Sequence, residues 1–304
     1  MRIAVTGASG FIGQHVLTEL LKHGVEIVAA SRDATKLTDL SESIQIITMD
    51  ISDPAPACFE QLGYPDVLIH LAWSGLPNYR SSHHLDTELP RQYHFLKTMI
   101  EAGLTSLLVA GTCFEYGMQS GALSEDMQAK PSNPYGQAKD ILRQQLESLK
   151  SKNQFKFTWA RLFYMYGQHQ ASTSLYQSIR AAVLRGDKVF NMSGGEQLRD
   201  YLPVTEVARQ IVQLAMAQRD VGIVNICSGI PISVRGLVEK WLRENNWKIE
   251  LNPGYFPYPD YEPMAFWGSV DKLTSLQMNG FDERICSSPV TTENTDLTDK
   301  KLLP

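Results

Sequence analysis

The sequence predicts an α/β fold, a doubly wound parallel sheet followed by a smaller C-terminal substrate-binding lobe. Three observations lead to this prediction. Short apolar runs alternate with longer helical patterns over the first 165 residues. A glycine-rich turn follows the first apolar run, and the chain becomes more polar and loop-rich after residue 166. Continuous apolar strands that alternate with helices are typical of a parallel sheet covered on both faces.

The expected elements follow one another in a regular order. The strand "RIAVT" precedes a helix near 11–23, and further strands are expected in "EIVAAS", "IQIITM" and "DVLIHLA". A helix near 86–102 precedes the strand "TSLLVAG", and a helix that begins at Pro134 precedes "FKFTWARL". A helix near 204–218 and the strand "GIVNIC" return the chain to the sheet.

Composition and charge argue against several classes of function. The net charge is −5 and no long basic block is present, so we expect neither nucleic acid nor anionic membrane as a partner. The longest apolar runs are too short to span a bilayer, and the first residues are typical of a strand and turn, not a signal peptide. Cys58, Cys113, Cys227 and Cys286 lack metal-type spacing. We therefore expect a reduced, cytoplasmic protein without a metal site.

The glycine turn has the features of a phosphate-binding site. Gly7, Gly10 and Gly13 in "TGASGFIG" lie between the first strand and the first helix. A tight turn, a close approach to a pyrophosphate and close helix–strand packing need residues without side chains, and the helix N-terminus adds free N–H groups. The spacing is GxxGxxG and not GxGxxG, yet its position predicts dinucleotide binding. The residues expected to contact the dinucleotide here are Gly7, Ser9, Gly10, Phe11, Ile12 and Gly13.

The ends of the second and third strands bear on which dinucleotide is bound. Many NAD sites place an acidic residue after the second strand, whereas this chain has Ser31 and Arg32. Arginine suits a 2′-phosphate, so NADP(H) is favoured and NAD(H) stays possible; the alternative is that Arg32 is a solvated loop residue. Asp50, followed by Ile51, could accept a hydrogen bond from the adenine amine, or it could cap its own loop.

A tyrosine and a lysine stand four residues apart in "NPYGQAKD" at 133–140. Such pairs share one helix face and often lie on surfaces without a role. The chemical alternative is that the Lys139 cation lowers the pKa of Tyr135 from about 10, so that Tyr135 can give a proton to a carbonyl. Asn133 can cap this helix and Pro134 suits its first position, which would hold Tyr135 at a rigid helix start.

Three ordered motifs, "TGASGFIG", "GTCFEYG" and "NPYGQAK", resemble those of the extended short-chain dehydrogenase/reductases, in the nucleotide-sugar branch of NAD-dependent epimerases and dehydratases. "HLAW", "ARLFYMYG" and "LRDYLPVTEVA" stand where that family has further motifs, so the resemblance runs from residue 1 to about 275. It implies that Tyr135 is the acid/base, that Lys139 assists it on the nicotinamide ribose, and that Thr112 binds the substrate carbonyl.

Changes in character along the chain give the expected domains. Residues 1–165, with about 204–229, would form a Rossmann dinucleotide-binding domain in which Leu71 and Ala72 line the cofactor channel. Residues 166–203 and 230–285 would form a nucleotide-sugar-binding lobe. Residues 286–304 have little apolar content and would form a flexible tail.

The resemblance also implies a homodimer, because family members commonly pair the helices near 86–102 and after Pro134 into a four-helix bundle. Apolar side chains recur at helical spacing on both helices. The alternative is that this stripe only faces the sheet. The stripe consists of Leu142, Leu146 and Leu149 on the later helix and Tyr93, Leu96 and Ile100 on the earlier one.

The residues near Thr112 bear on the reaction, which the fold alone does not decide. Relatives that are 4,6-dehydratases carry Asp-Glu directly after this threonine, and Cys113 and Phe114 cannot perform that proton transfer. "RDY" at 199–201 resembles the stretch that holds the diphosphate, with Arg199 as the anchor; the alternative is a salt bridge to an acidic neighbour. Tyr164 replaces the Asn of "RxxNxYG", so contacts near the sugar must differ.

The pattern "RLFYMYG…FWGSVDKL" most resembles reductases of 4-keto-6-deoxyhexose nucleotides, such as synthases of dTDP-fucose, dTDP-6-deoxytalose and CDP-abequose. We therefore predict NAD(P)H-dependent reduction of the C4 keto group of a dTDP-4-dehydro-6-deoxyhexose, in deoxysugar or O-antigen biosynthesis. An alternative is an NAD-dependent 4-epimerase of a UDP- or CDP-sugar, which would use the same catalytic residues without net redox change. A redox-sensing binder would not need those residues. The expected substrate-binding residues are Trp73, Thr112, Cys113, Phe114, Tyr164 and Arg199.

Overall fold

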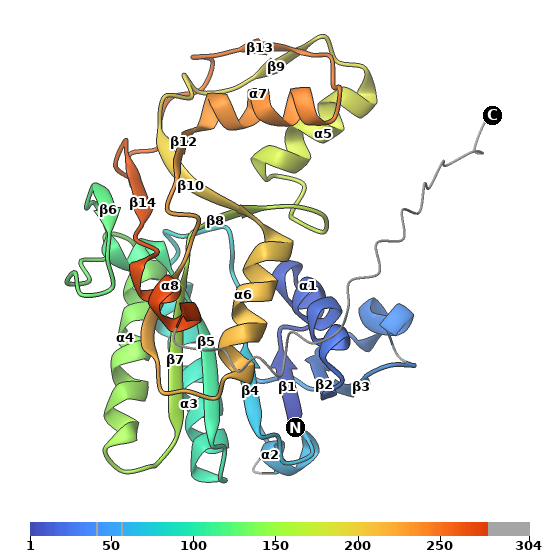
Figure 1. Ribbon diagram of the computed structural model, residues 1–304, viewed down its shortest axis with the longest axis vertical. Coiled ribbons are helices and arrows are strands. Elements are labelled where there is room, and N and C mark those ends of the chain that lie inside the picture. The colour runs from blue at the N-terminus through green and yellow to red at the C-terminus, as the bar shows by residue number, and fades with distance from the viewer. Residues whose placement is uncertain (41, 56, 279–304) are drawn as a thin grey trace.

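A central sheet of parallel strands organises the fold. The computed structural model describes residues 1–40, 42–55 and 57–278. The 7-stranded sheet has the order β11-β7-β5-β4-β1-β2-β3, and its neighbouring strands run parallel (Figure 1). The predicted doubly wound sheet is thereby confirmed, and the strand order reverses between β1 and β4. The bounds are β1 Arg2–Thr6, β2 Glu26–Ser31, β3 Gln45–Thr48, β4 Val67–His70, β5 Ser106–Thr112, β7 Lys156–Leu162 and β11 Gly222–Ile226.

Helices cover both faces of this sheet. On one face α1 (Phe11–Leu20) packs against α6 (Val204–Met216), with α8 (Asp271–Met278) beside β11. On the other face α3 (Leu89–Glu101) packs against α4 (Pro134–Lys150), with the short α2 (Cys58–Gln61) beside α3. Strands enclosed on both sides have no solvated face, which explains why they are apolar runs without alternation. β5, for example, is buried at every position.

The smaller lobe stands over the carboxyl ends of the strands, at the top of Figure 1. Two of its strands continue from the sheet: β8 (Tyr164–Tyr166) follows β7, and β12 (Pro231–Ser233) follows β11. Between them lies β10, and a separate apolar core holds the lobe together around Ile179, Val238 and Trp241. Parallel sheets bind ligands at this edge, so a site between sheet and lobe is expected.

The remaining elements of the lobe and its junction are short. They are α5 Leu175–Arg185, β9 Val189–Asn191, β10 Leu198–Pro203, α7 Val234–Glu244 and β13 Glu250–Asn252 in the lobe, with β6 Gly121–Leu123 paired to β14 Phe266–Gly268 at its base. The predicted tail at 286–304, including Cys286, and the last predicted residues of the lobe lie outside the described residues.

Four short helical turns complete the chain. Three are 3₁₀ turns, η1 (Leu21–His23), η2 (Ala34–Leu40) and η4 (Cys113–Tyr116), and η3 (His84–Glu88) is a π-helical turn that leads into α3. Turns of the π type are rare and often occur at functional sites. η3 borders the site described below.

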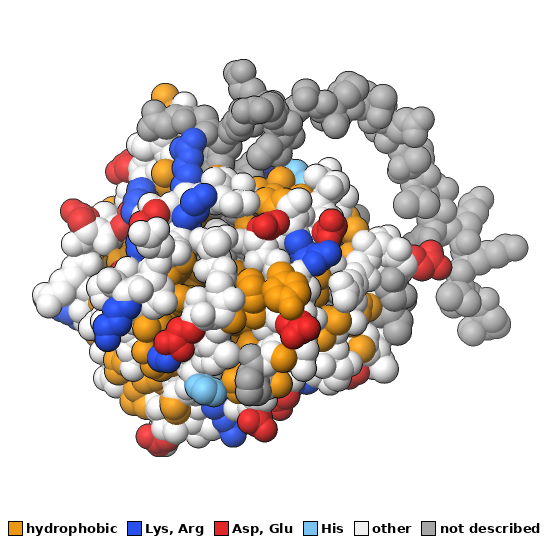
Figure 2. All heavy atoms as spheres, turned by 90° about the horizontal axis from the view of Figure 1, so that it is seen from below, with side chains coloured by type: hydrophobic (Ala, Val, Ile, Leu, Met, Phe, Trp, Pro, Cys, Tyr) orange, Lys and Arg blue, Asp and Glu red, His pale blue; other side chains and the backbone are white. Residues whose placement is uncertain are grey.

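Surface charge is mixed on the face seen from below in Figure 1. Figure 2 shows Lys, Arg, Asp and Glu side chains interspersed there. Among the described helices, none combines the length and apolarity that a membrane span needs. The same described residues contain no group of three or more His, Cys, Asp or Glu side chains that could hold a metal ion.

The start of α4 confirms the capping that the sequence predicts. The Asn133 side chain accepts a 2.9 Å hydrogen bond from the N–H of Gly136, and Pro134 occupies the first helical position. Tyr135 therefore lies in the first turn of the helix, and Lys139 lies one turn later. Both side chains belong to the buried face of α4.

The apolar stripe proposed for dimerisation faces the sheet instead. Leu142, Leu146, Leu96 and Ile100 all belong to the apolar core between the helices and the strands. One stripe cannot serve both surfaces, so these leucines give no support to an interface. The homodimer stays a prediction that rests on the resemblance alone.

Leu146→Ala should lower the free energy of unfolding by about 2–5 kcal/mol, because it leaves a cavity in this core. Ile141→Ala, on the same helix at 38% exposure, is the matched control and should change stability by about 0.5 kcal/mol at most. Chemical denaturation measures both. Unchanged stability of Leu146→Ala together with a changed sedimentation coefficient would return the stripe to an interface.

Candidate active site

The glycine turn after β1 lies against the end of β4. Gly7 has a φ of 70°, and a Cβ there would lie 2.7 Å from the backbone nitrogen of Ala72. A Cβ on Gly13 would collide with the carbonyl oxygen of Gly7. The N–H of Gly10 donates a 2.9 Å hydrogen bond to that same oxygen. Close packing therefore requires residues without side chains at Gly7 and Gly13, as the motif predicts.

A cavity of about 550 Å³ opens beside this turn, at the carboxyl ends of β1, β2 and β4. This is the point at which the strand order reverses, where doubly wound folds bind dinucleotides. Phe11, Ile12 and Gly13 form the first turn of α1. The predicted cofactor residues that line the cavity are Gly7, Ser9, Gly10, Ser31, Arg32, Asp50, Ile51, Leu71 and Ala72.

Charges of both signs line the end of this cavity next to β2 and β3. Arg32 is exposed at the end of β2, and Lys36 and Arg91 line the cavity with it. Asp33 lines it too, directly beside Arg32. A cation suits a 2′-phosphate and a carboxylate suits a 2′-hydroxyl. Both are available here, so the lining by itself does not select NADP(H) over NAD(H).

Two local contacts order the ends of β2 and β3. The hydroxyls of Ser9 and Ser31 lie 2.8 Å apart and join the glycine turn to β2. The Asp50 carboxylate accepts hydrogen bonds from the hydroxyl and the N–H of Ser52, at 2.7 and 2.9 Å, which lowers the pKa of Asp50. The loop-capping alternative considered for Asp50 is therefore present, and its carboxylate still lines the cavity.

β5 and α4 bring the three predicted catalytic residues together. Thr112, Tyr135 and Lys139 are 6%, 8% and 3% exposed. The Thr112 hydroxyl oxygen accepts a 3.3 Å hydrogen bond from the N–H of Phe114, which leaves its own hydrogen available to donate. The Lys139 amine donates to the carbonyl of Ala110 at 2.9 Å and lies 5.9 Å from the centre of the Tyr135 ring.

Burial controls the protonation of this pair. It raises the pKa of Tyr135 well above its ordinary value, and Tyr79 adds to the rise, while a hydrogen-bonding contact with Thr112 opposes it. Burial also lowers the pKa of Lys139 to about 7, against the charges of Glu115 and Glu88. The sequence-based expectation that Lys139 lowers the pKa of Tyr135 is thus outweighed by desolvation. Tyr135 carries its proton at neutral pH, as a proton donor must.

The indole ring of Trp73 packs against the Lys139 amine. Trp73, which the sequence analysis assigned to the substrate, lines the cofactor cavity, and its ring lies 3.9 Å from the Lys139 Nζ. Its Nε1 donates to Nδ1 of His84 at 3.1 Å, and Nε2 of His84 donates to the carbonyl of Asn78 at 2.9 Å. A cation above an indole face is stabilised by the ring quadrupole, so Trp73 holds the amine beside the cavity.

A chain of buried polar groups under the cavity was not predicted. His70 contacts the Thr6 hydroxyl at 2.8 Å and the Gln92 side-chain oxygen at 2.7 Å, and burial lowers the pKa of His70 to about 3. Gln92 in turn donates to Glu88, which also accepts from the hydroxyl of Ser74 at 2.6 Å. "HLAW" marks this strand end in the sequence, but the partners on η3 and α3 are brought to it only by the fold.

Aromatic rings surround Tyr135 on its other side. The Tyr79 ring lies 4.7 Å from Phe114 and 5.5 Å from Tyr135, centre to centre. Tyr261 lies 6.4 Å from Tyr79 and 6.3 Å from Phe114. Phe114 was predicted to contact the substrate, whereas Tyr79 and Tyr261 were missed because they lie in loops without a motif. We call Tyr79, Phe114 and Tyr261 the aromatic wall.

Arg199, the predicted diphosphate anchor, forms its polar contacts with other groups of the protein. Arg199 is 3% exposed and forms a 2.9 Å salt bridge with Glu262. It also donates to the carbonyls of Leu198 and Met264, at 2.9 and 3.3 Å. The structure therefore favours the salt-bridge alternative for Arg199.

Two further predicted substrate residues lie in the same region. Cys113 is buried, and its burial together with the charge of Glu262 raises the pKa of the thiol. The Tyr164 ring lies 5.2 Å from the Tyr201 ring, and its buried hydroxyl has no hydrogen-bond partner within the described part of the chain. Burial and then the nearby Glu262 carboxylate raise the pKa of this hydroxyl, so it is protonated at neutral pH.

Comparisons with known proteins agree with this arrangement. The chain resembles dTDP-6-deoxy-L-talose 4-dehydrogenase (NAD(+)) of Aggregatibacter actinomycetemcomitans, at 32% identity over 88% of this chain and 100% of the relative. GDP-6-deoxy-D-talose 4-dehydrogenase of the same organism is 25% identical, with 92% of each chain covered. The solved structure of MoeE5 in complex with UDP-glucuronic acid and NAD superposes with a TM-score of 0.76 at 25% identity, covering 90% of this chain and 92% of that one.

A family model also matches most of the chain. The model for the NAD dependent epimerase/dehydratase family matches residues 3–227. This span contains the glycine turn, the cavity beside it and all three residues Thr112, Tyr135 and Lys139. The chain therefore belongs to the NAD dependent epimerase/dehydratase family.

Proposed function

We propose that this protein is an oxidoreductase that transfers hydride between a nicotinamide dinucleotide and C4 of a nucleotide-linked 6-deoxyhexose, in the reductive direction on a dTDP-4-dehydro-6-deoxyhexose. The observation that carries the proposal is the convergence of Thr112, Tyr135 and Lys139, with the Lys139 amine over the ring of Trp73, which lines the cavity beside the glycine turn. The relative that acts on dTDP-6-deoxy-L-talose, matched over its full length, supports the choice of sugar nucleotide.

Each residue of the trio has a role that its surroundings support. When bound, the dinucleotide supplies or accepts the hydride. Tyr135 is protonated at neutral pH and gives its proton to the C4 oxygen, and in the oxidative direction it takes that proton back. Thr112 donates a hydrogen bond to the same oxygen. Lys139, near its own pKa of about 7, orients the ribose and can return a proton toward Tyr135.

The aromatic wall supports a 6-deoxy sugar. Tyr79, Phe114 and Tyr261 present ring carbons next to Tyr135. A methyl group at C6 packs well against such a surface, whereas a C6 carboxylate would be desolvated there at a large cost. The nearby guanidinium of Arg199 is already paired with Glu262, so it is not free to neutralise a uronic acid.

The same wall bears on the alternative reactions. Elimination needs a second acid and base after Thr112, and this chain has a thiol with a raised pKa and a phenyl ring there. A 4-epimerase must turn the keto sugar over within the site, and it would use the same Thr112, Tyr135 and Lys139. Epimerases are also prominent among the relatives, including a UDP-glucose 4-epimerase of Corynebacterium glutamicum. A 4-epimerase is therefore the second candidate.

The assay that separates the two candidates measures cofactor and sugar together. The protein is incubated with dTDP-4-dehydro-6-deoxyglucose and NADPH or NADH, the nicotinamide absorbance is followed, and the sugar product is identified by NMR. We expect one equivalent of cofactor to be oxidised for each sugar reduced at C4. An epimerised sugar without net oxidation of cofactor would establish the 4-epimerase instead.

Tyr135→Phe should lower kcat by about a hundredfold or more, the usual effect of removing a general acid. The ring and its packing are retained, so dinucleotide binding measured by fluorescence should match that of the parent protein. Turnover close to the parent rate would remove Tyr135 from the mechanism.

Preference for NADP(H) over NAD(H) rests on Arg32, whereas the descriptions of the dTDP-6-deoxy-L-talose 4-dehydrogenase and of the MoeE5 complex name NAD. If Arg32 meets a 2′-phosphate, Arg32→Asp should lower the ratio of kcat/KM for NADPH to that for NADH by about tenfold or more, since a charge contact of about 1.4 kcal/mol is lost. Lys22→Asp, at an exposed cation that does not line this cavity, is the matched control. An unmoved ratio would show that Arg32 does not select the cofactor.

Arg199→Ala should lower the free energy of unfolding by about 3–5 kcal/mol, because Glu262 would remain buried without its partner. Arg199→Ala combined with Glu262→Gln should restore much of that stability. Denaturation of the two variants gives the comparison. A large rise in KM for the nucleotide sugar at unchanged stability would instead support Arg199 as the diphosphate anchor.

A further inference from the structure

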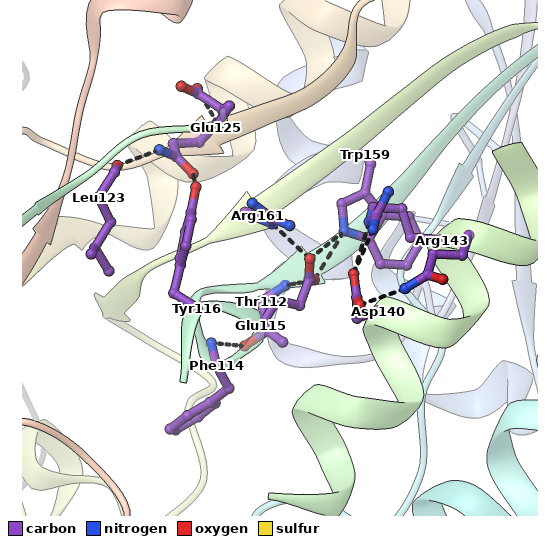
Figure 3. Close-up of polar contacts among 12 residues, drawn as sticks. Thr112, Phe114, Glu115, Tyr116, Leu123, Glu125, Asp140, Arg143, Trp159 and Arg161 are labelled. Carbon is purple, nitrogen blue, oxygen red and sulfur yellow. Dashed lines mark hydrogen bonds and ion pairs between the residues drawn. The ribbon is translucent and has the colours of Figure 1, made fainter. Parts of the chain in front are cut away.

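A buried carboxylate lies directly beneath Thr112. Glu115, in η4, is 0% exposed. One of its oxygens accepts a 2.8 Å hydrogen bond from the backbone N–H of Thr112, and Nε1 of Trp159 donates to both oxygens at 2.9 and 3.1 Å (Figure 3). The Nε of Arg161 donates to the second oxygen at 2.6 Å. Every donor comes from β5 or β7, so the carboxylate ties the turn after β5 to the neighbouring strand.

The fold around this carboxylate is tightly constrained. A Cβ on Gly111 would lie 2.7 Å from the nearer oxygen of Glu115 and would collide with the indole nitrogen of Trp159. Arg161 is 1% exposed and lies over the Tyr116 ring at 4.5 Å. The Tyr116 hydroxyl donates to the Asn225 side chain at 2.8 Å, which extends the network to β11 (Figure 3). The surrounding side chains therefore hold the Glu115 carboxylate against the backbone N–H of Thr112.

Stability alone does not account for two charges at this place. A buried ion pair contributes little net stability compared with apolar residues of similar volume. Both side chains are enclosed by the protein, at 1% and 0% exposure, and lie away from solvent. What distinguishes Glu115 is its neighbours, since it lies under one member of the catalytic trio and acts electrostatically on the other two.

The charged and titratable groups that face the Lys139 amine come from four elements. Glu115 belongs to η4, Glu88 and His84 to η3, His70 to β4, and Tyr135 to the same helix α4. His70 and His84 are held neutral by burial, which lowers the pKa of each. The two carboxylates are therefore the groups that favour the ammonium form, and the larger effect is that of Glu115.

We propose that Glu115 is a positioning residue for the proposed reaction, which fixes Thr112 through its backbone N–H and supplies the buried negative charge that keeps Lys139 protonated beside Tyr135. The catalytic part of this inference rests on the proposed function. The electrostatic part concerns only residues of this chain and can be measured without substrate.

The test uses the full chain with lysine labelled by ¹³C at Cε, and follows the titration of Lys139 by NMR without cofactor. In Glu115→Gln the amide can still accept from Thr112, but the negative charge is gone, so the ammonium is less stable and should lose its proton at lower pH. We expect the Lys139 midpoint to fall by about one pH unit or more. Arg143→Gln is the control, because it breaks a less buried ion pair with Asp140 on α4, at 12% and 10% exposure, without touching Glu115.

A second variant guards against misfolding of Glu115→Gln, which leaves Arg161 buried without its partner. Glu115→Gln combined with Arg161→Met removes both charges and retains the volume. Its Lys139 midpoint should also fall, but by less than in Glu115→Gln, because the Arg161 cation that opposes the ammonium is removed together with the carboxylate that favours it. The alkaline limb of kcat/KM should move to lower pH in parallel. A midpoint equal to that of the parent in this folded double variant would overturn the proposal. Absence of C4 oxidoreductase activity in the parent protein would remove the proposed function but would leave the midpoint measurement valid.

Discussion

Burial of the Lys139 amine is the constraint on which the rest of the site depends. Desolvation works against the charged form of any buried amine, and here it brings the pKa of Lys139 down to about 7. The surrounding chain compensates with the carbonyl of Ala110, the indole of Trp73 and the carboxylates of Glu115 and Glu88. These partners come from β5, the loop after β4, η4 and η3. To keep a buried lysine amine partly protonated near pH 7, the fold must therefore bring partners from four elements to one point.

The parallel sheet is what makes this convergence possible. β4 and β5 are neighbours, so their carboxyl ends present Trp73 and Thr112 side by side at the edge where the glycine turn also lies. α4 then crosses the same face, with its start fixed by the Asn133 cap. Thr112 itself needs a further support, because it ends a strand and begins a turn. The Glu115 carboxylate provides this support by accepting a hydrogen bond from the backbone N–H of Thr112.

Local chemistry made the central parts of the site predictable from sequence. The glycine turn, the Asn-Pro helix start and the Tyr–Lys spacing each depend on backbone geometry within a few residues, and each takes the predicted form. The features that failed depend on long-range packing. Arg199 is paired with Glu262, 63 residues away, and no local pattern signals such a partner. The apolar stripe with Leu142 has the periodicity of any buried helix face. Only the position of the sheet shows whether that face packs on the protein core or on a partner.

The contacts of Trp73 and of the aromatic wall also depend on long-range packing. The sequence predicts Trp73 at the correct strand end, and its side chain lines the cavity beside the glycine turn and lies under the Lys139 amine, 5.9 Å from the Tyr135 ring. Tyr79 and Tyr261 lie in loops far apart in the chain, and the fold brings their rings to 6.4 Å from each other. Under the proposed function, residues of this kind contact the sugar, and their positions depend on loops that no local sequence pattern specifies.

Transfer of a labelled hydride tests the central claim most directly. The protein is supplied with NADH or NADPH that carries deuterium at the transferable position of the nicotinamide, together with dTDP-4-dehydro-6-deoxyglucose. We predict a product with one deuterium at C4 of the sugar and an equal amount of oxidised cofactor. A sugar product without deuterium at C4, formed while the reduced cofactor persists, would contradict C4 oxidoreduction as the function of this site.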